Sequence, residues 1–199
     1  MERSISDFHR FYESIARPIS ETDAAVQILD IGCGTGLELE AIFKKAPNAL
    51  VTALDLSPGM LRELRKRYEV RLDQLTVIRE SYLEVPLGEG DYDYAVGVMT
   101  LHHLLPARKK ALYRRIRRAL NRGGLYIEGD WVVSLEEERR YLSEYRERCG
   151  HLETSDEGGY HIDVPLSLET EKHLLLKAGF SSVDVIWQAN GNGVYVARG

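Results

Sequence analysis

The chain has 199 residues, of which 44% are hydrophobic and 29% charged, and a formal net charge of -5. That length suits one domain with a sizeable core, and the acidic balance argues against a surface built to hold a long phosphate backbone. No apolar run approaches the roughly 20 residues that a membrane helix needs, and the first residues lack the apolar stretch of a signal peptide. We therefore expect a cytoplasmic protein without a membrane contact.

The first half of the chain alternates apolar runs with amphipathic stretches, which predicts strands and helices around a mostly parallel sheet. An amphipathic helix is expected over residues 1–17, ending at Pro18. Ser57 and Pro58 have the residue types of a helix N-cap and first helical position. The strands expected in this half cover residues 26–31, 50–56, 75–80 and 94–100.

The second half continues with a basic helix over residues 107–120 and a fifth strand over residues 125–131. Residues 132–165 form an insertion that is very polar, with a helical pattern in its first part. A further helix is expected after Ser167. Two final strands are joined by Asn190 and Gly191, a dipeptide typical of hairpin turns. This order predicts a single α/β domain that ends in a hairpin.

The strongest local signal is the segment ILDIGCGTG, residues 28–36, between a buried strand and a helix. Its three glycines let the backbone turn sharply and approach a ligand without a Cβ in the way. Such a loop also presents backbone N–H groups at a helix N-terminus. Three glycines in five residues indicate a ligand-binding loop rather than a plain tight turn.

Asp55 ends the second strand, where an acidic residue in α/β folds can accept hydrogen bonds from both ribose hydroxyls. The same two features fit a nicotinamide dehydrogenase, but the dinucleotide fingerprint is G-x-G-x-x-G and this loop is the shorter G-C-G-T-G. Asp30 is a further difference, because an acid there can reach the amino group of a methionine moiety. The alternative for Asp30 is a strand-end residue bonded to the local backbone.

With these motifs in place, the chain resembles the class I S-adenosylmethionine-dependent methyltransferase family. The matching pieces, in the expected order, are LDIGCGTG (29–36), ALDLSPGML (53–61), YDYAV (92–96), LHHL (101–104), LNRGGLYI (120–127) and KAGFSSVDV (177–185). The resemblance implies a Rossmann-like, doubly wound α/β fold whose seven-stranded sheet is mostly parallel with an antiparallel last strand. It also implies S-adenosyl-L-methionine as cofactor, and it is strongest to small bacterial enzymes that act on small molecules.

The resemblance also implies which residues hold the cofactor. The methionine end would be contacted by Asp30, Gly32, Gly34 and Gly36. Asp55 would hold the ribose, with Leu56 and Met60 near the adenine.

Three further cofactor positions follow from the same resemblance. Ser81, followed by Tyr82, stands where many members have an aspartate that faces the adenine amino group, so adenine recognition has to rely on other groups. Thr100 would line the opening near the sulfonium.

Catalytic residues are poorly marked in the sequence, because the cofactor is already activated and a base is needed only for a protonated nucleophile. Candidates follow the fourth and fifth strands, where ligand crevices form in open α/β sheets. His102 is the candidate base, with His103 beside it, and Asp130 could orient an acceptor; packing and helix capping are the alternatives for these residues. His161 is expected to touch the acceptor.

The predicted organisation is one domain over residues 1–199, with the N-terminal helix as a cap and the insertion as a lid over the acceptor. A metal site from Asp130, His161 and Asp163 lacks a close-spaced ligand pair, so no metal is expected. The acceptor is predicted to be a small molecule methylated on oxygen or nitrogen, rather than carbon or sulfur. The alternative is a cofactor-binding or RNA-docking module, supported only by the basic helix, which a solvated helix face explains more simply.

Overall fold

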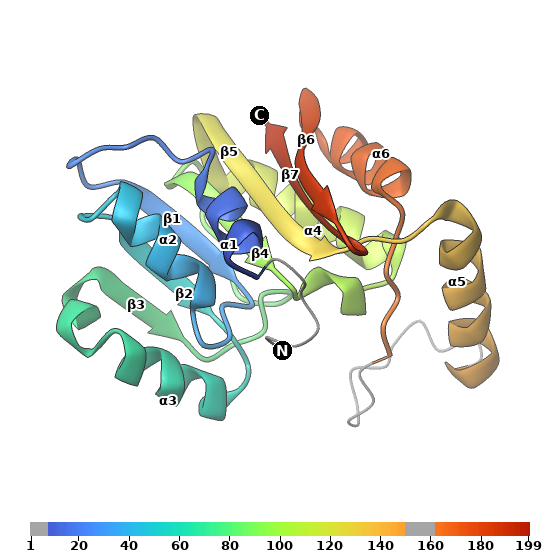
Figure 1. Ribbon diagram of the computed structural model, residues 1–199, viewed down its shortest axis with the longest axis horizontal. Coiled ribbons are helices and arrows are strands. Elements are labelled where there is room, and N and C mark those ends of the chain that lie inside the picture. Colours follow the sequence, from blue (N-terminus) through green and yellow to red (C-terminus); the bar gives the residue numbers. More distant parts are fainter. Residues whose placement is uncertain (1–7, 150–161) are drawn as a thin grey trace.

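The computed structural model of the chain describes residues 8–149 and 162–199. Its centre is a twisted sheet in the strand order β3-β2-β1-β4-β5-β7-β6 (Figure 1). The strands are β1 (Gln27–Ile31), β2 (Leu50–Leu54), β3 (Leu75–Ile78), β4 (Tyr92–Val98), β5 (Leu120–Trp131), β6 (Ser182–Ala189) and β7 (Asn192–Arg198). Neighbours pair in parallel except β7, which is antiparallel to both β5 and β6. The predicted sheet is therefore confirmed.

Helices cover both faces of the sheet (Figure 1). One face carries α1 (Phe8–Ala16), α2 (Leu37–Lys45) and α3 (Pro58–Arg67), and the other carries α4 (Pro106–Ala119) and α6 (Leu168–Ala178). The helix α5 (Leu135–Cys149) extends away from both layers. Each face has its own buried apolar cluster, because alternate residues of a strand point to opposite sides.

The ends of several elements follow the expected local chemistry. The Ser57 hydroxyl accepts from the amide of Met60 at the start of α3, and the Ser167 hydroxyl accepts from the amide of Thr170 at the start of α6. Gly179 ends α6 in the left-handed region, with φ 108°. The turn between β6 and β7 uses Asn190 and Gly191, both with positive φ, as the hairpin signal predicted.

Several element boundaries differ from the expectation by one or two residues, and two of the differences involve β4 and β5 beside the cavity. The strand expected to run to Thr100 ends at Val98, because Met99 adopts φ 50° and turns the chain out of the sheet. The strand expected to start at Leu125 begins at Leu120, where it pairs with Tyr92 before a register shift. The turn after β4 therefore carries Met99 and Thr100.

The basic helix α4 was interpreted as a solvated face, and that interpretation is wrong for two of its cations. Lys109 is 1% exposed, and Arg115 donates to the backbone carbonyls of Tyr82, Leu83 and Val85. Both side chains are turned inward because buried acids and loop carbonyls on that side offer them partners. Within the described residues, no helix is long and apolar enough to cross a membrane.

The helix α1 packs directly on the sheet near the end of β5. A Cβ on Gly129 would overlap Ile15 and crowd Phe11, so glycine at that position allows the close approach. Phe11 also contacts Trp187 edge-on, and Arg17 donates to the carbonyl of Ile186 at 2.9 Å. This packing holds α1 over the carboxyl ends of the central strands.

Candidate functional site

A cavity of about 840 Å³ lies at the carboxyl ends of β1, β2 and β4, the usual place for ligands in an open α/β sheet. Its lining comes from the glycine loop, the ends of β2 and β4, the start of α3 and the helix α1. The residues that line it are Tyr12, Gly32, Cys33, Gly34, Thr35, Leu37, Glu38, Asp55, Leu56, Ser57, Met60, Arg67, Tyr82, Val98, Met99, Thr100 and His103.

The glycine loop has the backbone that its sequence predicts. Gly32, Gly34 and Gly36 all have positive φ, between 52° and 69°. A Cβ on Gly32 would overlap the side chain of Thr100, and one on Gly36 would crowd Tyr68. A Cβ on Gly34 would meet nothing within 4 Å, because this position faces the cavity. The loop therefore presents bare backbone to whatever occupies the cavity.

Asp55 joins the glycine loop to the second strand. One of its carboxylate oxygens accepts from the amide of Gly34 at 2.9 Å, and the other accepts from the amide of Ser57 at 2.7 Å. Each oxygen has a second lone pair. Asp55 can thus order the loop and still accept hydrogen bonds from a ligand in the cavity.

Two buried carboxyl groups lie behind the loop without internal partners. Both oxygens of Asp30 are buried and have no hydrogen bond among the described residues, and the same is true of Oε1 of Glu38. Burial, with the nearby Glu38 carboxyl, raises the pKa of Asp30 well above its ordinary value. Burial likewise raises the pKa of Glu38 to about 7. Unpaired buried acids are costly, so this pair indicates a site for a cationic group.

Cys33 lies in the same loop and is not a nucleophile. Burial raises the pKa of its thiol, and the carboxyl groups of Asp30 and Glu38 raise it further. A neutral, buried thiol behaves as a small apolar side chain.

The other end of the cavity is bounded by the short 3₁₀ turn η3 (Leu101–His103), which follows Met99 and Thr100. His103 lines the cavity, whereas His102 is buried behind it with its ring 4.1 Å from that of His103. Nδ1 of His103 lies 3.0 Å from Oδ1 of Asp163. This end of the cavity therefore combines an imidazole with a carboxylate.

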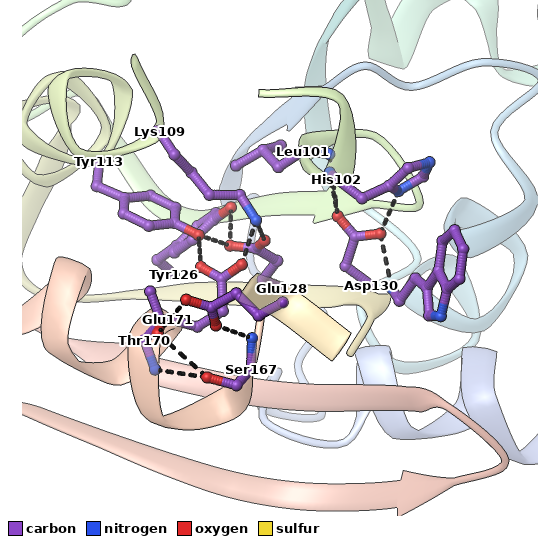
Figure 2. A network of polar contacts seen from close by, with 12 residues as sticks. Leu101, His102, Lys109, Tyr113, Tyr126, Glu128, Asp130, Ser167, Thr170 and Glu171 are labelled. Carbon is purple, nitrogen blue, oxygen red and sulfur yellow. Dashed lines mark hydrogen bonds and ion pairs between the residues drawn. The ribbon is translucent and has the colours of Figure 1, made fainter. Parts of the chain in front are cut away.

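Asp130 fixes the position of His102. Its Oδ1 is 2.5 Å from Nδ1 of His102, and its Oδ2 accepts from the amides of Leu101 and His102 (Figure 2). Burial acts to lower the pKa of His102, but the carboxylates of Asp130 and Asp163 outweigh it and raise that pKa. Burial acts to raise the pKa of Asp130, yet His102 lowers it overall. The two side chains thus form a close contact that is mostly buried.

The predicted site residues are thus only partly together. Among those predicted for the cofactor, the cavity is lined by Gly32, Gly34, Asp55, Leu56, Met60, Tyr82 and Thr100. Asp30 lies beneath the loop, and Gly36 begins α2 against Tyr68. Ser81 accepts from the amide of Leu83 and does not line the cavity.

Of the predicted catalytic residues, His102 and Asp130 pair with each other beside the cavity, and His161 lies outside the described residues. Sequence reasoning missed Glu38 and Arg67 as lining residues. A signal for Glu38 exists, since the first helical turn after the glycine loop carries acids at positions 38 and 40 and one of them must face inward. No local signal separates His103 from His102.

The described parts of the insertion, residues 132–149 and 162–165, are not among the residues that line the cavity. Those parts reach the turn η3 through the carboxylate of Asp163 and through the amide of Val164, which donates to the carbonyl of His102 at 2.6 Å. The ring of Tyr141 in the insertion lies 5.5 Å from that of Trp131 at the end of β5. The role of this insertion as a lid stays a prediction. Tyr160 lies outside the described residues.

Comparison with known proteins places this geometry in context. Residues 28–124 match a family described as "Methyltransferase domain". A carboxy-S-adenosyl-L-methionine synthase of Campylobacter fetus is 24% identical over 86% of this chain and 76% of its own length. A malonyl-[acyl-carrier protein] O-methyltransferase of Priestia megaterium is 30% identical over 67% of this chain and 47% of its own.

Solved structures share the fold at low identity. Human N-acetylserotonin methyltransferase, in complex with its cofactor, superposes with a TM-score of 0.67 at 16% identity, over 94% of this chain and 51% of that one. A phosphoethanolamine N-methyltransferase of Haemonchus contortus gives the same TM-score at 20% identity, over 89% of this chain and 38% of that one. The chain thus spans about half of the first of these two proteins and 38% of the second.

Proposed function

This chain belongs to the class I S-adenosylmethionine-dependent methyltransferase family, and we propose that it transfers the cofactor's methyl group to an oxygen or nitrogen of a small-molecule acceptor. The observation that carries the proposal is one cavity with two chemically different ends. The loop end has bare backbone and unpaired buried acids, and the η3 end has His103 backed by Asp163.

The loop end fits the cofactor. The buried carboxyl groups of Asp30 and Glu38 offer a partner to the ammonium of its methionine moiety, and Gly34 leaves room for the backbone to approach. Asp55 takes the ribose hydroxyls with its remaining lone pairs. Leu56 and Met60, which are 63% and 47% exposed, gain cover from the adenine ring.

The η3 end fits an acceptor that arrives with a proton on its nucleophilic atom. The cofactor supplies a methyl group already activated on a sulfonium, so the protein's part is to align the acceptor, exclude water and take up the proton. His103 and Asp163 are the polar groups that an O–H or N–H nucleophile meets there. A carbon nucleophile without an O–H or N–H proton would not form these hydrogen bonds with His103 and Asp163.

The cofactor end is tested by two matched glycine variants. Gly34 and Gly90 both have positive φ, and a Cβ on either would meet nothing within 4 Å, but only Gly34 lines the cavity. Gly34→Ala and Gly90→Ala should therefore lose similar stability, about 1 kcal/mol each. Only Gly34→Ala should weaken S-adenosylhomocysteine binding in calorimetry, by roughly tenfold or more, since one lost contact of about 1.4 kcal/mol is tenfold.

The transfer itself is tested by release of S-adenosylhomocysteine from S-adenosylmethionine in the presence of small phenols, carboxylic acids and amines. Cofactor-dependent release with at least one of these, and methylation on oxygen or nitrogen by mass spectrometry, is the expected result. Equal loss of S-adenosylhomocysteine affinity in both glycine variants would contradict the placement of the cofactor. Methylation exclusively on carbon would contradict the acceptor class.

A further inference from the structure

Three side chains with metal-binding chemistry meet at the η3 end of the cavity. His102 and His103 are consecutive residues of the 3₁₀ turn, and Asp163 belongs to the segment that leads into α6. The amide of Val164 donates to the carbonyl of His102 at 2.6 Å, which holds this segment against the turn. Residues 60 positions apart in the chain are thereby fixed side by side.

Their potential ligand atoms are close enough to share one ion. Oδ1 of Asp163 lies 3.0 Å from Nδ1 of His103 and 3.9 Å from Nε2 of His102. One nitrogen or oxygen from each residue lies within 4.8 Å of the other two. Ligand atoms that each lie about 2.1 Å from a shared ion are roughly 3 to 3.5 Å from one another. The three side chains therefore need to move only slightly closer together to bind one ion.

A second observation comes from the far side of His102. Its Nδ1 is 2.5 Å from Oδ1 of Asp130, whose other oxygen is held by two backbone amides (Figure 2). A carboxylate in that position favours the tautomer with the proton on Nδ1, which leaves a lone pair on Nε2, the nitrogen that lies 3.9 Å from Oδ1 of Asp163. This carboxylate–histidine arrangement is the one that orients imidazole ligands in metal sites.

We propose that His102, His103 and Asp163 bind a divalent transition-metal cation of the zinc or cobalt type at the η3 end of the cavity. Two imidazoles and one carboxylate are a ligand set that such cations favour over Mg²⁺ or Ca²⁺. Three protein ligands leave a coordination position open, and because His103 lines the cavity, that position faces the acceptor.

The purpose of the cation rests on the proposed function, whereas its binding does not. A cation bound to the acceptor's hydroxyl lowers the pKa of that hydroxyl, so that the oxygen is present as a nucleophile near neutral pH. The proton then leaves to solvent or to a neighbouring base before methyl transfer. The cation would thus make the hydroxyl acidic enough to lose its proton to solvent, without a dedicated side-chain base.

Direct binding of Co²⁺ tests the proposal without any acceptor. The full chain, free of any histidine tag and treated with a chelator, is titrated with Co²⁺ while the visible d–d absorption is recorded, and with Zn²⁺ by calorimetry. We expect saturation at one cation per chain and an absorption band typical of four- or five-coordinate Co²⁺. Asp163→Asn and His103→Gln should each weaken Co²⁺ binding by about 100-fold. Each variant removes a direct ligand, and loss of even an outer-shell partner of a ligand costs roughly 10- to 100-fold in metal affinity.

Asp184→Asn is the matched control, because Asp184 is an exposed carboxylate on β6 that pairs with Arg198. It should leave Co²⁺ affinity unchanged, and all three variants should keep a folded chain by circular dichroism. The proposal is overturned if Co²⁺ does not bind, or if Asp163→Asn and His103→Gln bind it as tightly as the parent. If protein treated with a chelator transfers the methyl group at the full rate, the cation has no catalytic role and the proposed function is unaffected. If the protein binds the cation but methylates no acceptor, the cation site stands and the proposed function is contradicted.

Discussion

Two groups of buried carboxyl side chains lie on opposite faces of the sheet, and they differ in how they are paired. On the α4 and α6 face, Glu128 and Glu171 surround Lys109, with Tyr113 2.7 Å from an oxygen of each acid (Figure 2). On the α1 and α2 face, Asp30 has no hydrogen bond among the described residues, and Glu38 leaves one oxygen unpaired.

The pairing of buried carboxyl groups distinguishes those that stabilise the fold from those that are available to bind a ligand. The first group, which we call the lysine cluster (Lys109, Tyr113, Glu128 and Glu171), contains its own counter-charge and joins β5 to two helices. The second, the loop acids (Asp30 and Glu38), has its carboxyl groups together beside a cavity, and among the described residues no lysine or arginine forms an ion pair with either. Of the two groups, the loop acids are the one whose unpaired oxygens lie beside the cavity, where a ligand can reach them.

The largest expected effect is on stability and concerns the lysine cluster. Lys109→Met should leave two buried carboxyl groups without their cation, and breaking a buried pair in this way costs about 3 to 5 kcal/mol. Urea denaturation followed by circular dichroism measures the loss. The neighbouring Lys110→Met, on the same helix but only half-buried, should change stability by less than about 0.5 kcal/mol. Equal losses in the two variants would show that the cluster does not stabilise the fold.

A smaller effect, on binding, is expected for the loop acids. Asp30→Asn keeps the shape of the side chain and removes a carboxyl whose pKa burial raises, so stability at pH 7 should stay within about 0.5 kcal/mol of the parent. Affinity for S-adenosylhomocysteine should fall by roughly 10- to 100-fold, the value of one hydrogen bond to a charged group. Denaturation and calorimetry on the same preparation measure both. A variant that loses several kcal/mol of stability yet binds normally would reverse the contrast between the two groups.

The smallest effect is a pH dependence of binding. Because the pKa of Glu38 is about 7 in the ligand-free protein, the loop acids hold a proton there that a bound ammonium group displaces. Affinity for S-adenosylhomocysteine should therefore rise severalfold from pH 6 to pH 8, with release of a proton to the buffer. Calorimetry in two buffers of different ionisation enthalpy detects that proton. Glu38→Gln should flatten the dependence, and a parent chain whose affinity falls as pH rises would exclude a role for these acids in ammonium binding.

The same contrast explains how far the sequence could predict the structure. The alternation of strands and helices, the hairpin at Asn190 and Gly191, and the glycine loop follow from short-range patterns, and the structure confirms them. The seven-stranded sheet was implied by the family resemblance and is confirmed as well. Asp30 was also recognised, because it stands next to that loop. The burial of Lys109 could not be recognised, since its partners Glu128 and Glu171 come from other elements.

The η3 end of the cavity shows the same limit. The sequence marks His102 and His103 equally, and only the three-dimensional structure shows that Asp130 holds His102 while His103 lines the cavity. Asp163 reaches them from a distant segment, so no spacing rule could join the three. Long-range contacts of this kind depend on how the elements pack, so they cannot be predicted from local sequence patterns.

The position of β7 has a consequence for the order in which the chain can fold during synthesis. Residues 192–198 insert between β5 and β6, so β5 keeps one unpaired edge until those residues have left the ribosome. The helix α1, which precedes the strands in the chain, packs against β5 and against Trp187 of β6. The earliest and latest segments of the described fold are thus neighbours, and until the last strand arrives the nascent chain carries an open strand edge, on which a chaperone or a misplaced pairing could act.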